Sequence, residues 1–457
     1  MDTVLIVNFS YVIAAIFFIV GLKLLSHPAT AKRGNLVSAV GMFIAVVVTL
    51  IRQDILSYEW IAAGIVLGGA IGAWLAKRVE MTEMPELVSL FNGFGGLASL
   101  LLGLSSLTIS DASDLHVALL VIAYFSILIG GITFSGSIVA WGKLGGTMPS
   151  RALIFPGMRW LYALIILGAL ALVVVVATQP FDMKWFYIAI GLALVFGILA
   201  TIPIGGADMP VVISLLNSYS GIAATAAGIA IQNNILIVAG LLVGASGIIL
   251  TQIMCKAMNR SLMNILLSGF SKPIEQGAKI EGEIKALSAE DAFYVLEAAQ
   301  SVVVIPGYGM AVAQAQHAVK ELQSLLEANG AEVAYAIHPV AGRMPGHMNV
   351  LLAEADVPYE QLYEMDAINP RMDSFDVAII IGANDVVNPA AKEMKGSPIY
   401  GMPIIEAHRA RNVFVLKRSA SAGFAGVDNP LFFKDNTRMV FGDAKDTLNT
   451  VIREFGD

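Results

Sequence analysis

The chain has 457 residues, of which 57% are hydrophobic and only 14% are charged, and its formal net charge is -7. A soluble globular protein averages about 45–50% apolar and about 25% charged residues, so this composition favours a chain embedded in a bilayer. The acidic balance argues against a nucleic-acid-binding protein, which needs a basic face, and the single cysteine, Cys255, excludes an intrachain disulfide and a cysteine metal cluster.

Apolar runs of the length of a membrane-spanning helix fill the first part of the chain. Such a helix needs about 20 mostly apolar residues, because hydrocarbon cannot satisfy free backbone groups. We predict a polytopic α-helical membrane domain over residues 1–261, with about nine spans. They lie near residues 4–25, 35–51, 60–76, 85–107, 116–141, 159–178, 185–202, 209–231 and 235–255.

Positive charge is distributed unevenly between the loops. The loops after even-numbered spans hold only Arg52 and Lys184, whereas the other Lys and Arg residues of this half follow odd-numbered spans. Because Lys and Arg accumulate in cytoplasmic loops, we expect the N-terminus outside and the C-terminal domain in the cytoplasm.

A few polar residues interrupt the predicted spans. Asn92 lies in the fourth span, Ser137 in the fifth and Asn217 in the eighth, while Asp208 opens the eighth just before Pro210. Polar groups are costly in lipid and usually face a cavity or a partner, so Asn92 and Asn217 should make polar contacts inside the bundle. For Ser137 a bond back to its own helix is the simpler interpretation. Asp208 could be a helix N-cap, which is compatible with a functional role.

The remainder of the chain has the pattern of a soluble domain. Residues 262–290 contain no long apolar run and predict a linker. Residues 291–457 alternate between strands and helices, which predicts an α/β Rossmann-like domain with a doubly wound parallel sheet. Strands are expected at residues 301–305, 332–337, 377–381 and 412–416, with a helical stretch after the first strand that reaches about residue 329.

A glycine motif follows the first of these strands. The spacing of Gly307, Gly309 and Val312 resembles the dinucleotide-binding fingerprint, with Val in place of the third glycine. Its position between a strand and a helix strengthens the match. Gly307 would permit a tight turn, and Gly309 would let the backbone approach a pyrophosphate at the helix N-terminus.

The residues around this motif favour NADP over NAD. An acidic residue usually holds the NAD ribose near the end of the second strand, but here that strand runs into His338 and Pro339. The 2′-phosphate of NADP favours a cation instead. Arg343 is one candidate, and the pair Lys417 and Arg418 is another. That pair could be merely solvated, but its position at the carboxyl end of a strand favours a binding site.

These residues, taken together, resemble the beta subunit of proton-translocating NAD(P)+ transhydrogenase over nearly the whole chain. In the membrane half the strongest matching segments are residues 81–87, 205–210, 216–221 and 255–261. In the soluble half they are residues 306–316, 338–352, 382–385, 429–433 and 442–445.

The resemblance implies a proton-conducting membrane domain, an NADP(H)-binding soluble domain, and an alpha subunit that binds NAD(H). It also implies a bacterial inner membrane, a dimeric assembly with a second copy of this chain, and no metal site. The residues implied in proton coupling are Asp385, Asp208, Asn217, Asn92 and Ser137. The residues implied in NADP(H) binding are Gly307, Tyr308, Gly309, Met310, Ala311, Val312, Val340, Ala341, Gly342, Arg343, Pro345, Gly346, Asn384, Asp385, Asn388, Lys417, Arg418, Ser419, Gly423, Phe424, Gly442, Asp443, Ala444 and Lys445.

The sequence departs from some relatives at two of these positions. Asn92 replaces a histidine, so a direct proton relay is excluded there and a water-organising role remains. Phe424 replaces a tyrosine, which removes a hydroxyl contact with the nucleotide. A nucleotide-sensing transporter or channel without redox chemistry is the alternative function. Transhydrogenation by the chain together with an alpha subunit distinguishes the two.

Overall fold

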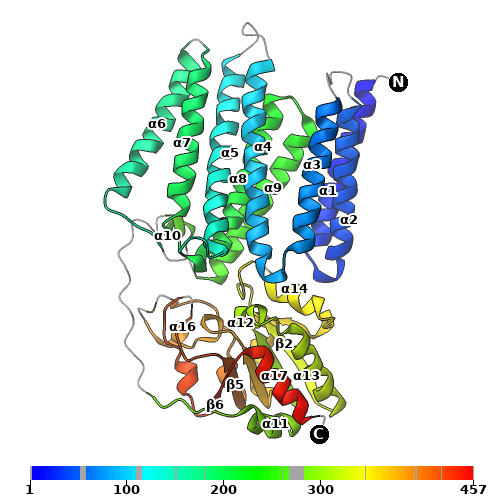
Figure 1. Ribbon diagram of the computed structural model, residues 1–457, viewed down its shortest axis with the longest axis vertical. Coiled ribbons are helices and arrows are strands. Elements are labelled where there is room, and N and C mark those ends of the chain that lie inside the picture. Colours follow the sequence, from blue (N-terminus) through cyan, green and yellow to red (C-terminus); the bar gives the residue numbers. More distant parts are fainter. Residues whose placement is uncertain are drawn as a thin grey trace. The chain divides into compact units, whose positions relative to one another are not determined.

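The computed structural model describes residues 3–51, 58–109, 116–149, 152–179, 181–259, 261–266, 282–344, 346–395, 397, 399–423 and 425–455. Much of the predicted linker, residues 267–281, lies outside these ranges, and so do Pro345 and Phe424. The chain divides into two units, a helical one built from the first 251 residues and a second one that contains the C-terminal sheet (Figure 1).

Nine helices in the described ranges are long and apolar enough to cross a membrane, as the sequence predicts. They are α1 (Thr3–Leu25), α2 (Pro28–Leu50), α3 (Tyr58–Arg78), α4 (Met84–Ile109), α5 (Val117–Leu144), α6 (Met158–Thr178), α7 (Met183–Thr201), α8 (Met209–Ala230) and α9 (Asn234–Ala257). The largest difference from the prediction is at α2, which begins at Pro28 instead of near residue 35. Proline suits the first helical turn, where its missing N–H would have no partner.

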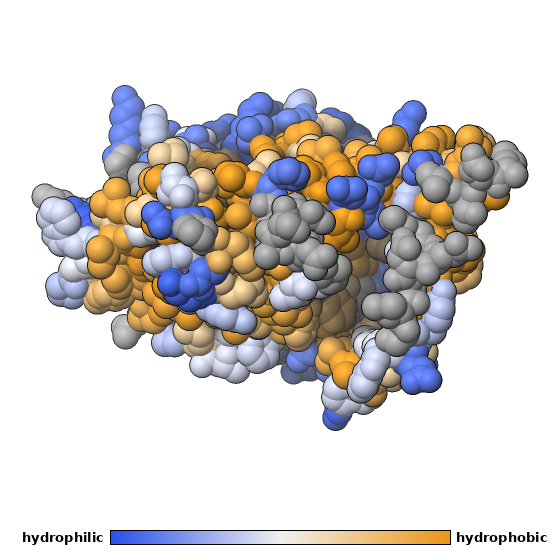
Figure 2. Space-filling view, turned by 90° about the horizontal axis from the view of Figure 1, so that it is seen from above, coloured by the Kyte–Doolittle hydropathy of each residue, from blue (hydrophilic) through white to orange (hydrophobic). Residues whose placement is uncertain are grey.

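Small residues and hydroxyls hold the helical unit together. A Cβ atom at Gly130 of α5 would lie 2.6 Å from the carbonyl oxygen of Gly96 on α4, so only glycine permits this approach. Ser126 of α5 donates a hydrogen bond to the Ser99 carbonyl on α4 at 2.8 Å. Seen from above, broad areas of the surface are apolar (Figure 2), as expected for helices whose outer sides contact lipid.

The second unit contains six parallel strands in the order β3-β2-β1-β4-β5-β6. This order confirms the Rossmann-like prediction. The strands are β1 (Ser301–Pro306), β2 (Glu332–Ile337), β3 (Leu362–Glu364), β4 (Val377–Ile381), β5 (Asn412–Lys417) and β6 (Thr437–Phe441). The two edge strands, β3 and β6, were not among those predicted. The register pairs Pro306 with Ile381, so the loops that follow β1 and β4 begin side by side.

The helices of this unit include α10 (Leu262–Leu266), α11 (Ala289–Glu297), α12 (Tyr308–Val312), α13 (Gln316–Ala328), α14 (His347–Glu354), α15 (Met365–Ile368), α16 (Ala390–Glu393) and α17 (Ala444–Glu454). The continuous helix predicted after β1 is wrong. Gln314 adopts a φ of 48°, which ends the right-handed helix and separates α12 from α13.

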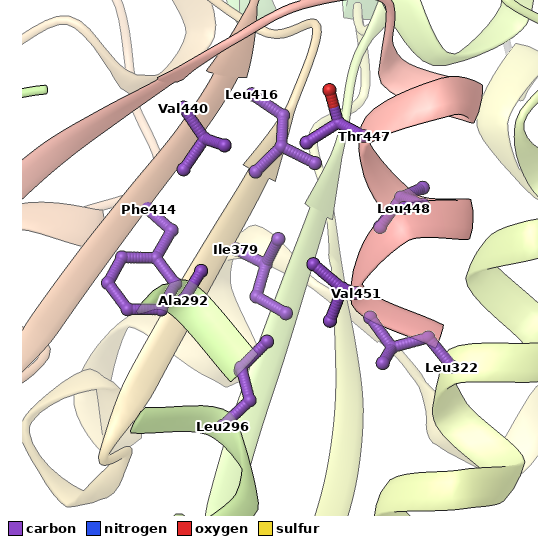
Figure 3. A pocket seen from close by; sticks show the side chains of 10 residues that line it. All are labelled: Ala292, Leu296, Leu322, Ile379, Phe414, Leu416, Val440, Thr447, Leu448 and Val451. Carbon is purple, nitrogen blue, oxygen red and sulfur yellow. The ribbon is translucent and has the colours of Figure 1, made fainter. Parts of the chain in front are cut away.

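An apolar layer joins one face of the sheet to α11, α13 and α17 (Figure 3). Ile379 and Leu416 point from the strands toward α17, which contributes Leu448 and Val451, while Phe414 lies beside Ala292 of α11. Burying each such side chain contributes about 1.5–3 kcal/mol. This layer holds α17 against the sheet, and α17 begins directly after the Gly442–Asp443 segment of the candidate site.

Candidate functional site

The loops after β1 and β4 meet where the order of the strands reverses, and sheets of this kind bind their ligands at that point. The Gly307 amide donates to the Ile381 carbonyl at 2.9 Å. A Cβ atom at Gly307 would lie 2.5 Å from the Ala383 nitrogen, and one at Gly309 would lie 2.6 Å from the Gly382 Cα. The glycines are therefore required by the close approach of two loops.

Gly307 is the single residue between β1 and α12, and its carbonyl accepts a hydrogen bond from the Met310 amide at 3.0 Å, so the connection is a tight one. Its own backbone is extended, with φ -131° and ψ -175°, so the turn does not use a left-handed conformation. The rest of the fingerprint forms α12, directly after β1. Met310 and Ala311 are buried, while Tyr308 is half-buried and Val312 is exposed.

The loop after β2 brings a cation to the fingerprint. The Arg343 guanidinium carbon lies 4.4 Å from the centre of the Tyr308 ring, which is a cation–π contact. The Arg343 amide donates to Nδ1 of His347 at 3.1 Å. Gly342 and Gly346 have φ values of 104° and 69°, which other residues rarely adopt. Arg343 thus places the loop after β2 against Tyr308 of the fingerprint.

His338 occupies the position just beyond β2. Its Nε2 lies 2.9 Å from the Pro403 carbonyl oxygen, and its Nδ1 accepts a hydrogen bond from the Val340 amide at 3.2 Å. The ring is buried, and burial lowers the pKa of His338 to about 4, although the bond to Pro403 opposes this shift. The end of β2 therefore presents a neutral ring. Sequence reasoning did not identify this anchoring role.

Asp385 lies beyond β4 and contacts the loop that contains Gly423. Its Oδ2 accepts a hydrogen bond from the Ala425 amide at 2.9 Å. Asn384 accepts one from Asn429 at 2.8 Å, and the fully buried Asn388 donates to the Asp428 carbonyl at 3.2 Å. Asn384 and Asn388 thus hold the segment around Asp385 to the loop after β5.

The end of β5 carries the predicted basic pair. The Lys417 ammonium lies 5.2 Å from the centre of the Phe432 ring and donates to the Ser421 carbonyl. Burial lowers the pKa of Lys417, and the Asp385 carboxylate opposes that shift. Lys417 is therefore held inside the site, and the interpretation of a freely solvated pair does not apply to it. Ser421 and Phe432 were not among the predicted site residues, although Phe432 lies in the matching segment 429–433.

The second member of that pair, Arg418, remains largely exposed. Its guanidinium lies 3.7 Å from the Asp443 carboxylate. Asp443 also caps α17, because its Oδ1 accepts a hydrogen bond from the Lys445 amide at 3.0 Å. Ser419 contacts the Ser421 hydroxyl at 2.7 Å. Arg418 thus links the end of β5 to the 442–445 segment, while Ser419 bonds within its own loop.

The cations on these loops fit an anionic nucleotide. Arg343, Lys417 and Arg418 follow parallel strands at their carboxyl ends, where dinucleotides bind. Guanidinium and ammonium groups form strong charge-assisted hydrogen bonds with phosphate oxygens. His338 is neutral and stands at the end of β2, where NAD-binding proteins usually carry an acidic residue. A carboxylate at this position would repel the 2′-phosphate of NADP, and this chain has none there.

A second polar cluster crosses the helical unit. The Asn92 amide donates to Ser137 Oγ at 3.1 Å, and Ser220 of α8 donates to Asn92 Oδ1 at 2.7 Å. Ser89 donates to the Ser137 carbonyl at 2.9 Å. The predicted contact of Asn92 is confirmed, whereas the bond of Ser137 to its own helix is replaced by this contact across helices. Ser89 was missed, and Ser220, a polar residue of the eighth predicted span, was not assigned to the site.

Two further candidates of the helical unit lie outside this cluster. Asn217 is half-buried about one turn before Ser220, and among the described residues no hydrogen bond joins it to Asn92 or Ser137. Asp208 occupies the N-cap position of α8 with Pro210 in the first turn, as expected, but its side chain makes no capping hydrogen bond.

Comparison with known proteins assigns the family. The sequence model of the NAD(P) transhydrogenase beta subunit matches residues 7–454. The chain belongs to this family. It is similar to the NAD(P) transhydrogenase subunit beta of Rhodospirillum rubrum and of a designated strain of that species. Each is 48% identical over 454 residues, which cover 97% of this chain and 98% of the relative.

Family membership resolves the coarse question of function. The chain is the beta subunit of an oxidoreductase, which favours the redox function over a nucleotide-sensing channel. The nine apolar helices make it a membrane protein, and the family implies both nicotinamide nucleotide binding and an alpha partner.

Proposed function

We propose that this beta subunit binds NADP(H) and conducts protons, in a transhydrogenase that couples hydride transfer between NADH and NADP+ to proton movement across the membrane. The proposal rests chiefly on the positive charge at the carboxyl edge of the sheet. Cations follow β2 and β5, and a neutral His338 stands near the usual place of a ribose-binding acid.

The loops at the carboxyl edge of the sheet would each bind a different part of the nucleotide. Gly307 to Val312 and Gly342 to Gly346 would hold the pyrophosphate region, with Arg343 placed by Tyr308. Lys417, Arg418 and Ser419 would hold the 2′-phosphate, and residues 442–445 would complete the pocket. Bound NADP+ would supply a nicotinamide ring that accepts a hydride. Asp385 would link the nucleotide state to proton state through its contact with the Ala425 amide.

The second nucleotide would come from another chain. The sequence contains one dinucleotide fingerprint, at Gly307, and hydride transfer requires the reacting atoms to be about 3–3.5 Å apart. We therefore assign NAD(H) to the alpha subunit. A second copy of the chain would complete a dimeric assembly.

The proton route would use the polar cluster of the helical unit. It would pass Asn92, Ser137 and Asn217 and reach Asp208, the carboxylate at the start of α8. Asn92 cannot titrate, so it would organise water by the two directed hydrogen bonds that fix its amide. Loop charge supports a bacterial inner-membrane protein with its N-terminus outside and the nucleotide domain in the cytoplasm.

Titration calorimetry on the full chain in detergent tests the nucleotide assignment. NADPH should bind at least about 100-fold more tightly than NADH, because charge-assisted hydrogen bonds contribute roughly 1.5–3 kcal/mol each. NADH differs from NADPH only in lacking the 2′-phosphate, so the difference in affinity isolates the contribution of that group. Equal affinity for the two nucleotides would contradict the proposal.

A further inference from the structure

Lys143 is a buried lysine of the helical unit that the proposed route does not use. It lies on the last turn of α5, and its side chain is only 1% exposed. Lysine is almost never fully buried, because an ammonium group is costly to remove from water unless its donors are satisfied. A charged side chain retained at such a position is a candidate for function.

The ammonium group binds the end of a neighbouring helix. Its Nζ donates to the carbonyl oxygen of Ile202 at 2.6 Å and to that of Ile204 at 2.7 Å. Both residues lie just beyond Thr201, where α7 ends. Ile202 is the C-cap of α7, where the negative end of the helix dipole favours a cation, and its carbonyl also accepts a hydrogen bond from the Leu153 amide at 3.3 Å.

These two carbonyls begin the segment that carries Asp208. The segment runs from the end of α7 to the start of α8 and contains Gly205 and Gly206, which give its backbone unusual freedom. Residues 206–208 form a single 3-10 turn in which the Asp208 amide donates to the Gly205 carbonyl at 3.1 Å, so Asp208 moves together with Gly205. A Cβ atom built at Gly205 would meet nothing within 4 Å. The two bonds from Lys143 therefore tie down its first part.

Other charged groups lie at the same end of the helices that pack on α5. Glu86 of α4 reaches this end, because a Cβ atom at Gly145 would lie 2.8 Å from Glu86 Oε2. Arg159 lies in the first turn of α6, and Asp208 lies at the start of α8. A shift of the segment would change the distance of Asp208 from all of these charges.

We propose that Lys143 is a positioning residue for proton coupling. It holds the Ile202 and Ile204 carbonyls and thereby fixes the segment that presents the Asp208 carboxylate. The inference rests on the proposed role of Asp208, and it assigns to this lysine the placement of that group.

The test uses the full chain with its alpha subunit in vesicles, with proton uptake and hydride transfer measured over a range of pH. Lys143→Met should lower proton-coupled turnover about tenfold or more, because two charge-assisted bonds are lost. It should also shift the pH profile of turnover, while NADPH affinity stays at the wild-type value. Lys143→Arg, which keeps the charge and the donors, should restore the wild-type profile.

A second comparison separates positioning from simple stability. If Lys143 acts through Asp208, Lys143→Met should cause no further loss in an Asp208→Asn background, whereas independent effects would add. Lys143→Gln, which keeps an N–H donor without the charge, should fold even where the Met variant does not, and should show an intermediate shift.

The outcomes are distinct. A wild-type pH profile in both Lys143→Met and Lys143→Gln, or losses that add to that of Asp208→Asn, would overturn the inference alone. Vesicles of the wild-type protein that transfer hydride without moving protons would overturn the proposed function, and this inference with it.

Discussion

The Asp385 carboxylate lies directly against Gly423, because a Cβ atom built at that glycine would stand 2.5 Å from Asp385 Oδ1. The same carboxylate accepts the Ala425 amide at 2.9 Å. The loop after β5 can therefore approach the carboxylate only with glycine at residue 423. The ionisable Asp385 carboxylate therefore contacts the loop after β5 directly, and this loop belongs to the proposed nucleotide site.

Replacing Gly423 with Ala should displace the Asp385 carboxylate and break its bond with Ala425. Overpacking of this kind costs about 1–3 kcal/mol, so NADPH affinity should fall about tenfold or more. Titration calorimetry on the full chain measures the effect. Ala422→Ser, an exposed neighbour in the same loop, is the control and should bind as the wild type does. Unchanged affinity in Gly423→Ala would show that this contact is dispensable.

Replacing Lys417 and Arg418 with Ala should lower the preference for NADPH over NADH. Each charge-assisted bond contributes roughly 1.5–3 kcal/mol, so each substitution should reduce the preference about tenfold or more. The affinity for NADH should change much less, because it lacks the 2′-phosphate. Arg453→Ala removes an exposed cation at the end of α17 and should leave the preference intact. If the preference for NADPH is unchanged in both variants, other residues bind the 2′-phosphate.

The buried His338 should make the second unit less stable in acid. Its pKa is about 4 in the folded state against an ordinary value of 6.5, so the unfolded chain binds a proton first as pH falls. The stability is fully present above about 6.5 and falls toward pH 4, by up to about 3 kcal/mol in all. Burial also lowers the pKa of His408, which adds in the same direction.

Scanning calorimetry between pH 4 and pH 7.5 should follow this loss. His338→Asn should be less stable near neutral pH, because the bonds to Pro403 and Val340 are lost, but its stability should depend less on pH. His317→Asn changes an exposed histidine of α13 and should keep the wild-type pH dependence. A wild-type slope in His338→Asn would mean that this ring is not the titrating group.

Removing the hydroxyl of Ser220 should release one side of the Asn92 amide. Ser220→Ala should reduce stability by about 1 kcal/mol and slow proton-coupled turnover, because the amide would no longer be held in one orientation. Thr178→Val removes an exposed hydroxyl that bonds only within α6 and serves as the control. If Ser220→Ala and Thr178→Val pump protons equally well, the orientation of Asn92 does not matter for the route.

Much of this architecture could be predicted from the sequence. The nine spans are long apolar runs, and β1, β2, β4 and β5 are strongly apolar and bounded by loop residues. Strand β3 was missed because it has three residues, too few to show a period. The break at Gln314 was also missed, since a positive φ at a non-glycine residue leaves no signal in composition. Local pattern thus identified the central elements and missed the short and irregular ones.

The candidate site could be predicted only where a local sequence pattern next to a strand indicates the chemistry. The glycine fingerprint and the basic pair at Lys417 are such patterns. His338, Ser220 and Lys143 act through contacts with residues far along the chain, at Pro403, Asn92 and Ile202. No local spacing encodes such contacts, so they required the fold.

Hydride transfer by this subunit should require an NAD-binding partner and should move protons. The direct measurement places the purified chain in vesicles, with and without its alpha subunit, and follows hydride transfer from NADH to NADP+ together with internal pH. We predict no transfer by the chain alone, and transfer with a pH change that an uncoupler abolishes when the alpha subunit is added. Turnover by the chain alone, or transfer without any movement of protons, would contradict the proposed function.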